Sequence, residues 1–277
     1  MLAVTLMWSI AGVVSRQLHS AASFEVTFWR SFFTLLSVGG MLALRHGADL
    51  RAKLRSRALW VSGACWAVMF TCFMLAITLT TVANVLITLS VAPLFTALLA
   101  RLWLRRPLPL RTWGAIVAAG AGIAWMYSGN VSLLEGRNGL GVLVALCVPV
   151  AAALNWNLSQ RNGGHIDLIP AVLVGALLSS LVTLPLALPF RATGADLAWL
   201  ALLGVVQLGL PCMLAVWCAA RLPAPEISLL ALLEVIFGVL WAWLGAGEQP
   251  SVRVLTGGAV VLAALAVNEL WAMREKK

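Results

Sequence analysis

Charged residues are scarce in this sequence. Asp, Glu, Lys and Arg make up only 10% of the 277 residues, while 62% are hydrophobic and the mean hydropathy is +0.97. About a quarter of the residues in soluble domains are charged, so this composition excludes an ordinary soluble protein and predicts an all-α polytopic membrane protein. The formal net charge of +9 does not indicate nucleic-acid binding, because the basic residues lie in short loops and form no basic face.

Motifs for catalysis, ATP binding and metal binding are also missing. The three histidines lie in predicted loops without zinc-ligand spacing, and no phosphate-binding loop or nucleophile elbow occurs. The five cysteines lie inside apolar runs without CxxC pairs, as expected of apolar packing residues. We therefore expect neither an enzyme nor an ATP-driven pump, and neither a metal nor another cofactor.

Long apolar runs fill most of the chain. A membrane-spanning helix needs about 20 mostly apolar residues. On that measure we expect about ten helices, at residues 1–18, 24–44, 58–79, 82–104, 110–128, 139–160, 168–189, 196–220, 226–245 and 253–272. Thirteen basic residues lie on the side of both termini and four on the other side. This asymmetry places both termini in the cytoplasm.

The two halves of the chain share a sequence pattern. Residues 8–16 match residues 153–161 at an offset of 145, and residues 91–109 match residues 233–251 at an offset of 142. We therefore predict two five-helix repeats, at 1–130 and 138–273, followed by a cytoplasmic tail at 274–277. Because five is odd, the second repeat is inverted in the membrane. Such repeats place a binding site near the midplane, with access alternating between the two faces.

Glu234 is the sharpest candidate for a functional residue. It lies within the run LLEVIFGVL, and it is the only charged residue from Ser228 to Leu244. A carboxylate at bilayer depth is energetically costly and must face protein or water. It could bind a substrate amine or carry a proton, and the structural alternative is a helix–helix hydrogen bond.

Polar side chains in other spans are further candidates for the lining of a cavity. Asn155 and Asn157 flank Trp156 about 200° apart on a helical wheel, so one of them would face the cavity, with interhelical hydrogen bonding as the alternative. Proline frees a backbone carbonyl within a helix, which is tolerated where neighbours or water satisfy it. We expect a cavity between helices one, three, four, six, eight and nine. The substrate-binding candidates are Trp8, Trp66, Asn84, Thr88, Asn155, Asn157, Gln207 and Glu234, and the hinge candidates are Pro93 and Pro211.

Tryptophan is abundant, with 13 residues against one tyrosine. Most would anchor the protein at the membrane interfaces, but four lie deeper and could pack or stack on an aromatic substrate: Trp8, Trp66, Trp217 and Trp241. Small residues recur at four-residue spacing in the fifth and tenth spans, which indicates close helix packing in a scaffold or a dimer contact: Gly114, Ala118, Gly122, Ala259 and Ala263.

The order and duplication of short motifs resemble the drug/metabolite transporter superfamily, specifically its EamA-type ten-helix exporters. The motifs are Trp8 with Arg16, Phe28-Trp29-Arg30, Ala92-Pro93-Leu94-Phe95, Leu233-Glu234-Val235-Ile236-Phe237 and Leu244-Gly245-Ala246-Gly247-Glu248. Two positions depart from the family pattern. Arg106 stands where the family often has Glu, and Val235 stands where it often has Pro, which argues against a proline break in the ninth helix.

This resemblance implies an exporter of small metabolites in a lipid bilayer. A phosphate carrier would need paired Lys or Arg deep in its helices, whereas only Arg30 and Arg101 lie within spans, both near helix ends. We therefore expect an exporter in the bacterial inner membrane, as a monomer or weak homodimer. Its substrates would be amino acids, aromatic and other neutral ones. A multidrug or organic-cation exporter of the same fold, proton-coupled through Glu234, is the alternative.

Overall fold

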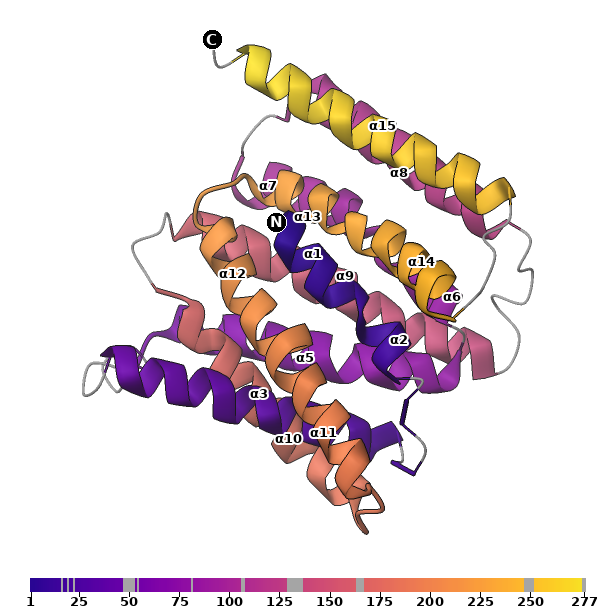
Figure 1. Ribbon diagram of the computed structural model, residues 1–277. Coiled ribbons are helices and arrows are strands. Elements are labelled where there is room, and N and C mark those ends of the chain that lie inside the picture. The colour runs from indigo at the N-terminus through magenta and orange to yellow at the C-terminus, as the bar shows by residue number, and fades with distance from the viewer. Residues whose placement is uncertain are drawn as a thin grey trace.

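The computed structural model describes residues 1–15, 17–18, 20–21, 23–46, 53, 55–80, 82–105, 108–128, 137–162, 167–246 and 252–275. All regular elements among these residues are helices, and none of them is a strand (Figure 1). The expected all-α polytopic fold is therefore confirmed. The turn that contains Glu248, the side chain of Asn84, and Lys276 and Lys277 of the expected tail lie outside the described residues.

The helices group into ten spans. Six of these spans are continuous single helices, among them α3 (Ser23–His46), α5 (Arg57–Leu79), α8 (Leu110–Tyr127), α9 (Arg137–Arg161) and α10 (Ile169–Ala187). The tenth span, α15 (Val252–Glu275), is also continuous. The first span consists of α1 (Leu2–Ser9) and α2 (Ala11–Ser15), the fourth of α6 (Val82–Leu89) and α7 (Ala92–Trp103), and the ninth of α13 (Ala224–Ala231) and α14 (Leu233–Ala246). The eighth span joins α11 (Gly194–Leu202), the π-helix η1 (Leu203–Gly209) and α12 (Leu210–Ala219).

Five described segments are individually long and apolar enough to cross a membrane. They are Phe24–Leu44, Arg57–Leu79, Gly139–Arg161, Ile169–Ala187 and Gly194–Ala219. The first, fourth and ninth spans are each divided into two shorter helices, so they reach a comparable length only as pairs. These positions agree closely with the expected ones, because long apolar runs with polar ends leave little freedom for the helix boundaries.

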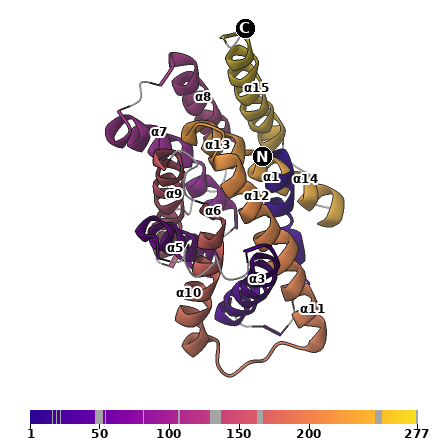
Figure 2. The same cartoon turned by 90° about the vertical axis from the view of Figure 1, so that its left-hand side faces the viewer.

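Some helices of equal rank in the two halves of the chain pack against each other. The second and seventh spans, α3 and α10, form one such pair, and the fifth and tenth spans, α8 and α15, form another (Figures 1 and 2). The fourth span contacts the sixth through α7 and α9, and the ninth contacts the first through α14 and α1. Such reciprocal contacts fit two related halves. The predicted repeat boundaries at 130 and 138 remain a prediction.

The crossing of α3, α5 and α10 is especially close. A Cβ atom at Gly175 of α10 would lie 2.4 Å from Cβ of Trp66, and one at Gly63 of α5 would lie 2.5 Å from Cγ1 of Val174. Hydroxyl groups tie the same three helices together, since Ser179 Oγ lies 2.9 Å from Ser31 Oγ and 3.0 Å from Thr71 Oγ1. Glycine lets the backbones approach, as is common between membrane helices, and fixes the position of Trp66.

The fourth and ninth spans are interrupted at matching positions. The fourth breaks at Ser90 and Val91, and the ninth breaks at Leu232, which is 142 residues after Ser90. Both breaks contain a backbone hydrogen bond to the residue three positions earlier, from Val91 N to Thr88 O and from Leu232 N to Leu229 O. The ninth span is thus interrupted without a proline, and Val235 continues as part of α14. The departure from the family pattern at Val235 therefore does not make this span continuous.

Proline stands at the start of the helix after two of the interruptions. Pro93 occupies the first turn of α7, after the break in the fourth span, and Pro211 occupies the first turn of α12, directly after η1. Proline fits the start of α7 because the first N–H groups of a helix have no intrahelical partner. Pro211 instead follows a π-helix whose helical backbone continues through Leu210. The hinge roles of Pro93 and Pro211 remain predictions.

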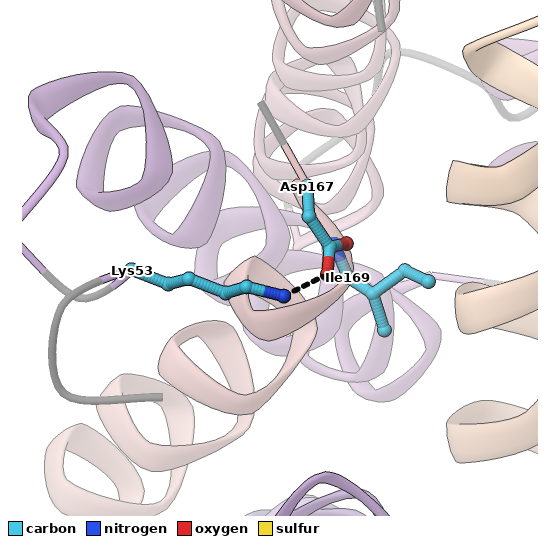
Figure 3. Close-up of polar contacts among 3 residues, drawn as sticks. All are labelled: Lys53, Asp167 and Ile169. Carbon is cyan, nitrogen blue, oxygen red and sulfur yellow. Dashed lines mark hydrogen bonds and ion pairs between the residues drawn. The ribbon is translucent and has the colours of Figure 1, made fainter. Parts of the chain in front are cut away.

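Two acidic side chains connect segments of different halves at opposite ends of the bundle. At one end, Lys53 Nζ lies 2.8 Å from Oδ2 of Asp167, whose Oδ1 accepts a hydrogen bond from Ile169 N at the start of α10 (Figure 3). At the other end, both carboxylate oxygens of Glu25 accept hydrogen bonds from Arg191 N, and Oε1 also accepts one from Ala192 N. Each contact joins the start of a helix of one half, α3 or α10, to a connecting segment of the other half.

Candidate substrate cavity

A cavity of about 130 Å³ lies between seven of the ten spans. The six spans expected to line it all contribute, and the second span contributes Arg30 in addition. Aromatic and aliphatic side chains make up most of the wall. The polar residues at the wall are Arg30, Gln207, Ser228 and Glu234, together with the indole groups of Trp8, Trp66 and Trp156.

The aromatic part of the wall is built mainly by α5 and α9. The rings of Trp66 and Trp156 meet edge to face with centroids 5.6 Å apart, and Trp66 lies 5.5 Å from Phe70 on its own helix. Edge-to-face contacts of this kind are favourable for aromatic pairs. Trp66 and Trp156 are both almost fully buried, so the two rings form a well-packed apolar surface on one side of the cavity.

Arg30 lies at the wall of the cavity, two turns into α3. Its side chain is only 2% exposed, its Nη2 donates a hydrogen bond of 3.3 Å to Phe70 O, and its guanidinium carbon lies 5.9 Å from the centre of the Phe73 ring. Its Nε has no hydrogen-bond partner. Arg30 was expected near a helix end, and the structure places it seven residues after the start of α3 at Ser23 and at the wall of the cavity. The helix α3 packs against α10 and against η1 of the eighth span.

Glu234 lies in the first turn of α14 and lines the same cavity. Arg30 lines the same cavity, but in the described part of the chain no direct ion pair or hydrogen bond is made by the carboxylate of Glu234. The structural alternative for Glu234, a helix–helix hydrogen bond, is therefore not seen among those residues. The N-terminus of a helix stabilises a negative charge. The break at Leu232 therefore favours a carboxylate at Glu234, in the first turn of α14.

Gln207 connects the π-helix to the first span. Its Nε2 donates a hydrogen bond of 3.2 Å to Trp8 O, near the end of α1. Its Oε1 has no hydrogen-bond partner, and the residue is only 3% exposed. Next to this contact, Trp241 Nε1 donates a hydrogen bond of 2.9 Å to Ser9 Oγ. These two bonds attach η1 and α14 to the same short helix, α1.

The two asparagines of the sixth span do not line the cavity. Asn155 accepts a hydrogen bond of 2.6 Å from Ser62 Oγ of α5, and Asn157 Nδ2 donates to Thr96 O of α7 and to Ala153 O. Pro149, Ala152 and Trp156 form the cavity-facing stripe of α9, which turns both asparagines toward neighbouring helices. Interhelical hydrogen bonding, the alternative interpretation, describes them better.

Other predicted residues also have different surroundings. Thr88 is buried but is not part of the cavity wall. Of the small residues in α8, Gly122 contacts α15, since a Cβ there would lie 2.9 Å from Gly257 O, whereas Gly114 faces open space. Trp217 is 51% exposed and stacks with Arg221 at 3.8 Å. Among the described residues, no group of three His, Cys, Asp or Glu side chains could hold a metal ion.

Comparison with known proteins agrees with this architecture. A solved crystal structure superposes with a TM-score of 0.81 over 100% of this chain and 97% of that one, at 17% sequence identity. This similarity concerns the fold alone. No curated protein matches the chain significantly. The sequence profile of the EamA-like transporter family matches residues 1–128 and 139–269. The chain therefore belongs to the EamA-like transporter family and is a multi-pass membrane protein that transports small molecules.

Proposed function

We propose that this protein exports neutral amino acids, aromatic ones among them, across the inner membrane of a bacterium. The observation that carries the proposal is the pair of opposite charges at the cavity wall. One buried arginine and one glutamate, Arg30 and Glu234, stand in a wall that is otherwise mostly aromatic and aliphatic. A neutral amino acid has the matching chemistry, with one carboxylate, one ammonium group and an uncharged side chain.

The same pair argues against two other substrate classes. An organic cation needs the carboxylate of Glu234, but the arginine in the same wall would repel it. A phosphate ester needs an excess of positive charge, and here Glu234 offsets the single arginine. Charges interact strongly in a protein interior of low dielectric constant. The balance of charge at the cavity wall should therefore dominate the choice of substrate class.

Alternating access is the mechanism that we infer for this transport. The fourth and ninth spans are interrupted at matching positions beside the cavity, where Ala92 and Glu234 both line the wall. Interrupted helices of inverted repeats commonly form the midplane site of a transporter and permit one repeat to rock against the other. The excess of basic residues in the loops on the side of the termini supports cytoplasmic ends.

Counterflow into proteoliposomes tests this function. The purified protein is reconstituted into liposomes loaded with unlabelled phenylalanine, and uptake of labelled phenylalanine is measured with competitors outside. We expect saturable uptake that leucine and tryptophan inhibit and that lysine, glutamate and a sugar phosphate do not. If no amino acid shows saturable uptake while a cationic dye is clearly transported, the organic-cation alternative replaces this proposal.

A further inference from the structure

We infer that the cavity binds the two charged ends of an amino acid at two separate poles. The donor pole is Arg30 with the indole N–H of Trp66, and it would bind the carboxylate. The acceptor pole is Glu234 with the side-chain oxygen of Gln207, and it would bind the ammonium group. This assignment rests on the proposed function and deepens it, because it gives four of the polar residues at the wall a part in substrate recognition.

The donor pole lies where α3 meets α5. Arg30 Nη2 donates to Phe70 O, and Phe70 follows Trp66 by one helical turn, so the guanidinium lies against the segment that carries the indole. Arg30 Nε and Trp66 Nε1 are both buried without a hydrogen-bond partner, and both residues are only 2% exposed. A guanidinium and a neighbouring N–H group are well suited to a carboxylate, since hydrogen bonds to charged groups are the strong ones.

The acceptor pole lies around α1. Gln207 is oriented by the hydrogen bond from its Nε2 to Trp8 O, which leaves Oε1 without a partner. Glu234 is placed on α14, which packs on α1 and is attached to it by the bond from Trp241 to Ser9. An amide oxygen and a carboxylate are acceptors only, and an ammonium group offers three donors.

The unused hydrogen-bonding capacity is the second argument. Buried polar groups are nearly always paired, and leaving one without a partner is costly. At this wall the unpaired atoms include two nitrogen donors, on Arg30 and Trp66, and one oxygen acceptor, on Gln207. The carboxylate of Glu234 adds a second acceptor. Two donors and two acceptors suit a zwitterion, whose carboxylate accepts and whose ammonium group donates. A ligand with a single charge of either sign would leave one of the two pairs without a partner.

Truncated ligands test the assignment. Phenethylamine lacks the carboxylate of phenylalanine, and 3-phenylpropionate lacks the ammonium group, while all three share the aromatic ring. Each is used as a competitor of labelled phenylalanine in equilibrium binding to the detergent-purified protein, so that affinity is measured apart from transport. We expect the wild-type protein to prefer phenylalanine over either truncated ligand by about tenfold or more, given the strength of charged hydrogen bonds.

Substitutions at the two poles should change these preferences in opposite directions. Arg30→Gln should weaken phenylalanine and 3-phenylpropionate by about ten- to a hundredfold, while phenethylamine keeps or improves its affinity. Glu234→Gln should weaken phenylalanine and phenethylamine to a similar degree and spare 3-phenylpropionate. Trp66→Phe should follow Arg30→Gln with a smaller effect, and Gln207→Leu should follow Glu234→Gln.

Matched variants separate recognition from folding. Arg30→Lys and Glu234→Asp keep the charge and should recover part of the preference. Arg101→Gln, on the exposed face of α7, should change no affinity. If Arg30→Gln and Glu234→Gln weaken all three ligands alike, while Arg101→Gln does not, the two-pole assignment is wrong. That result leaves amino-acid transport by the wild-type protein intact, whereas absence of phenylalanine binding and counterflow in the wild-type protein overturns the proposed function itself.

Discussion

Glu25 and Asp167 stand 142 residues apart, at matching points near the starts of α3 and α10, and each binds a connecting segment of the other half of the chain. Glu25 is fully buried and accepts hydrogen bonds from the backbone N–H groups of Arg191 and Ala192. Asp167 is 29% exposed and binds the side chain of Lys53. Glu25 lies in the first turn of α3 and Asp167 lies two residues before α10, and the two contacts differ greatly in burial.

This difference predicts unequal effects on stability. Glu25→Ala leaves two backbone N–H groups without acceptors and should destabilise the protein by about 2–4 kcal/mol. Asp167→Ala removes an ion pair whose side chains are about 30% exposed and the hydrogen bond from Ile169 N, and should cost about 1–2 kcal/mol. Thermal unfolding in detergent measures both variants. An equal loss in the two variants would show that burial does not decide the strength of these contacts.

Gly175 should not tolerate even a methyl group. Gly175→Ala places a Cβ 2.4 Å from Cβ of Trp66, so α5 and α10 must move apart, which should cost about 1–3 kcal/mol or more. Gly114→Ala is the matched control in a membrane helix, since nothing lies within 4 Å of its added Cβ. It should be neutral or slightly stabilising. The yield of folded protein in size-exclusion chromatography and its melting temperature compare the two variants.

Asn157 should contribute to stability and not to substrate affinity. Asn157→Leu removes the hydrogen bond from Nδ2 to Thr96 O, which joins α9 to α7, and should cost about 1–2 kcal/mol. Phenylalanine affinity should remain within about twofold of the wild-type value, because Asn157 does not line the cavity. Loss of a hydrogen bond to the substrate would lower the affinity by more than twofold. A large loss of affinity at unchanged stability would return Asn157 to the substrate site.

Val235→Pro should be tolerated in the ninth span. The substitution removes one hydrogen bond, from Val235 N to Leu232 O, and proline fits the first turn of a helix. We expect a loss of about 1 kcal/mol or less and a transport rate close to wild type. Failure of the variant to fold would mean that the interruption at Leu232 depends on this bond.

The helices could be predicted from the sequence almost residue by residue, because apolar runs of membrane length alternate with short polar loops. The interior of the site could be predicted only in part. Trp8, Trp66, Gln207 and Glu234 line the cavity, and their role in substrate binding stays a prediction. Asn155 and Asn157 do not line it, because the rotation of α9 about its axis is set by packing against α5 and α7. A polar residue within a span predicts that its side chain is buried, but it does not predict which neighbouring helix or cavity the side chain faces.

Arg30 was the residue that sequence reasoning missed. The sequence places Arg30 near the end of a span and outside the set of substrate-binding candidates, whereas in the structure it lies at the wall of the cavity, two turns after the start of α3 at Ser23. A signal was available, because Arg30 is the only charged residue from Val26 to Leu44. Glu234 is a candidate because no other charged residue lies near it in an apolar run, and the same criterion selects Arg30.

The close crossing of α3, α5 and α10 has a mechanical consequence for the proposed two-pole site. Arg30 and Trp66 stand on that crossing, while Glu234 stands on α14, which the break at Leu232 separates from α13. A ligand with both charges would therefore act as a cross-link between a stiff group of helices and a separate one, and a ligand with a single charge would not. Hydrogen exchange tests this directly, since phenylalanine should slow exchange along α14 and saturating phenethylamine should not.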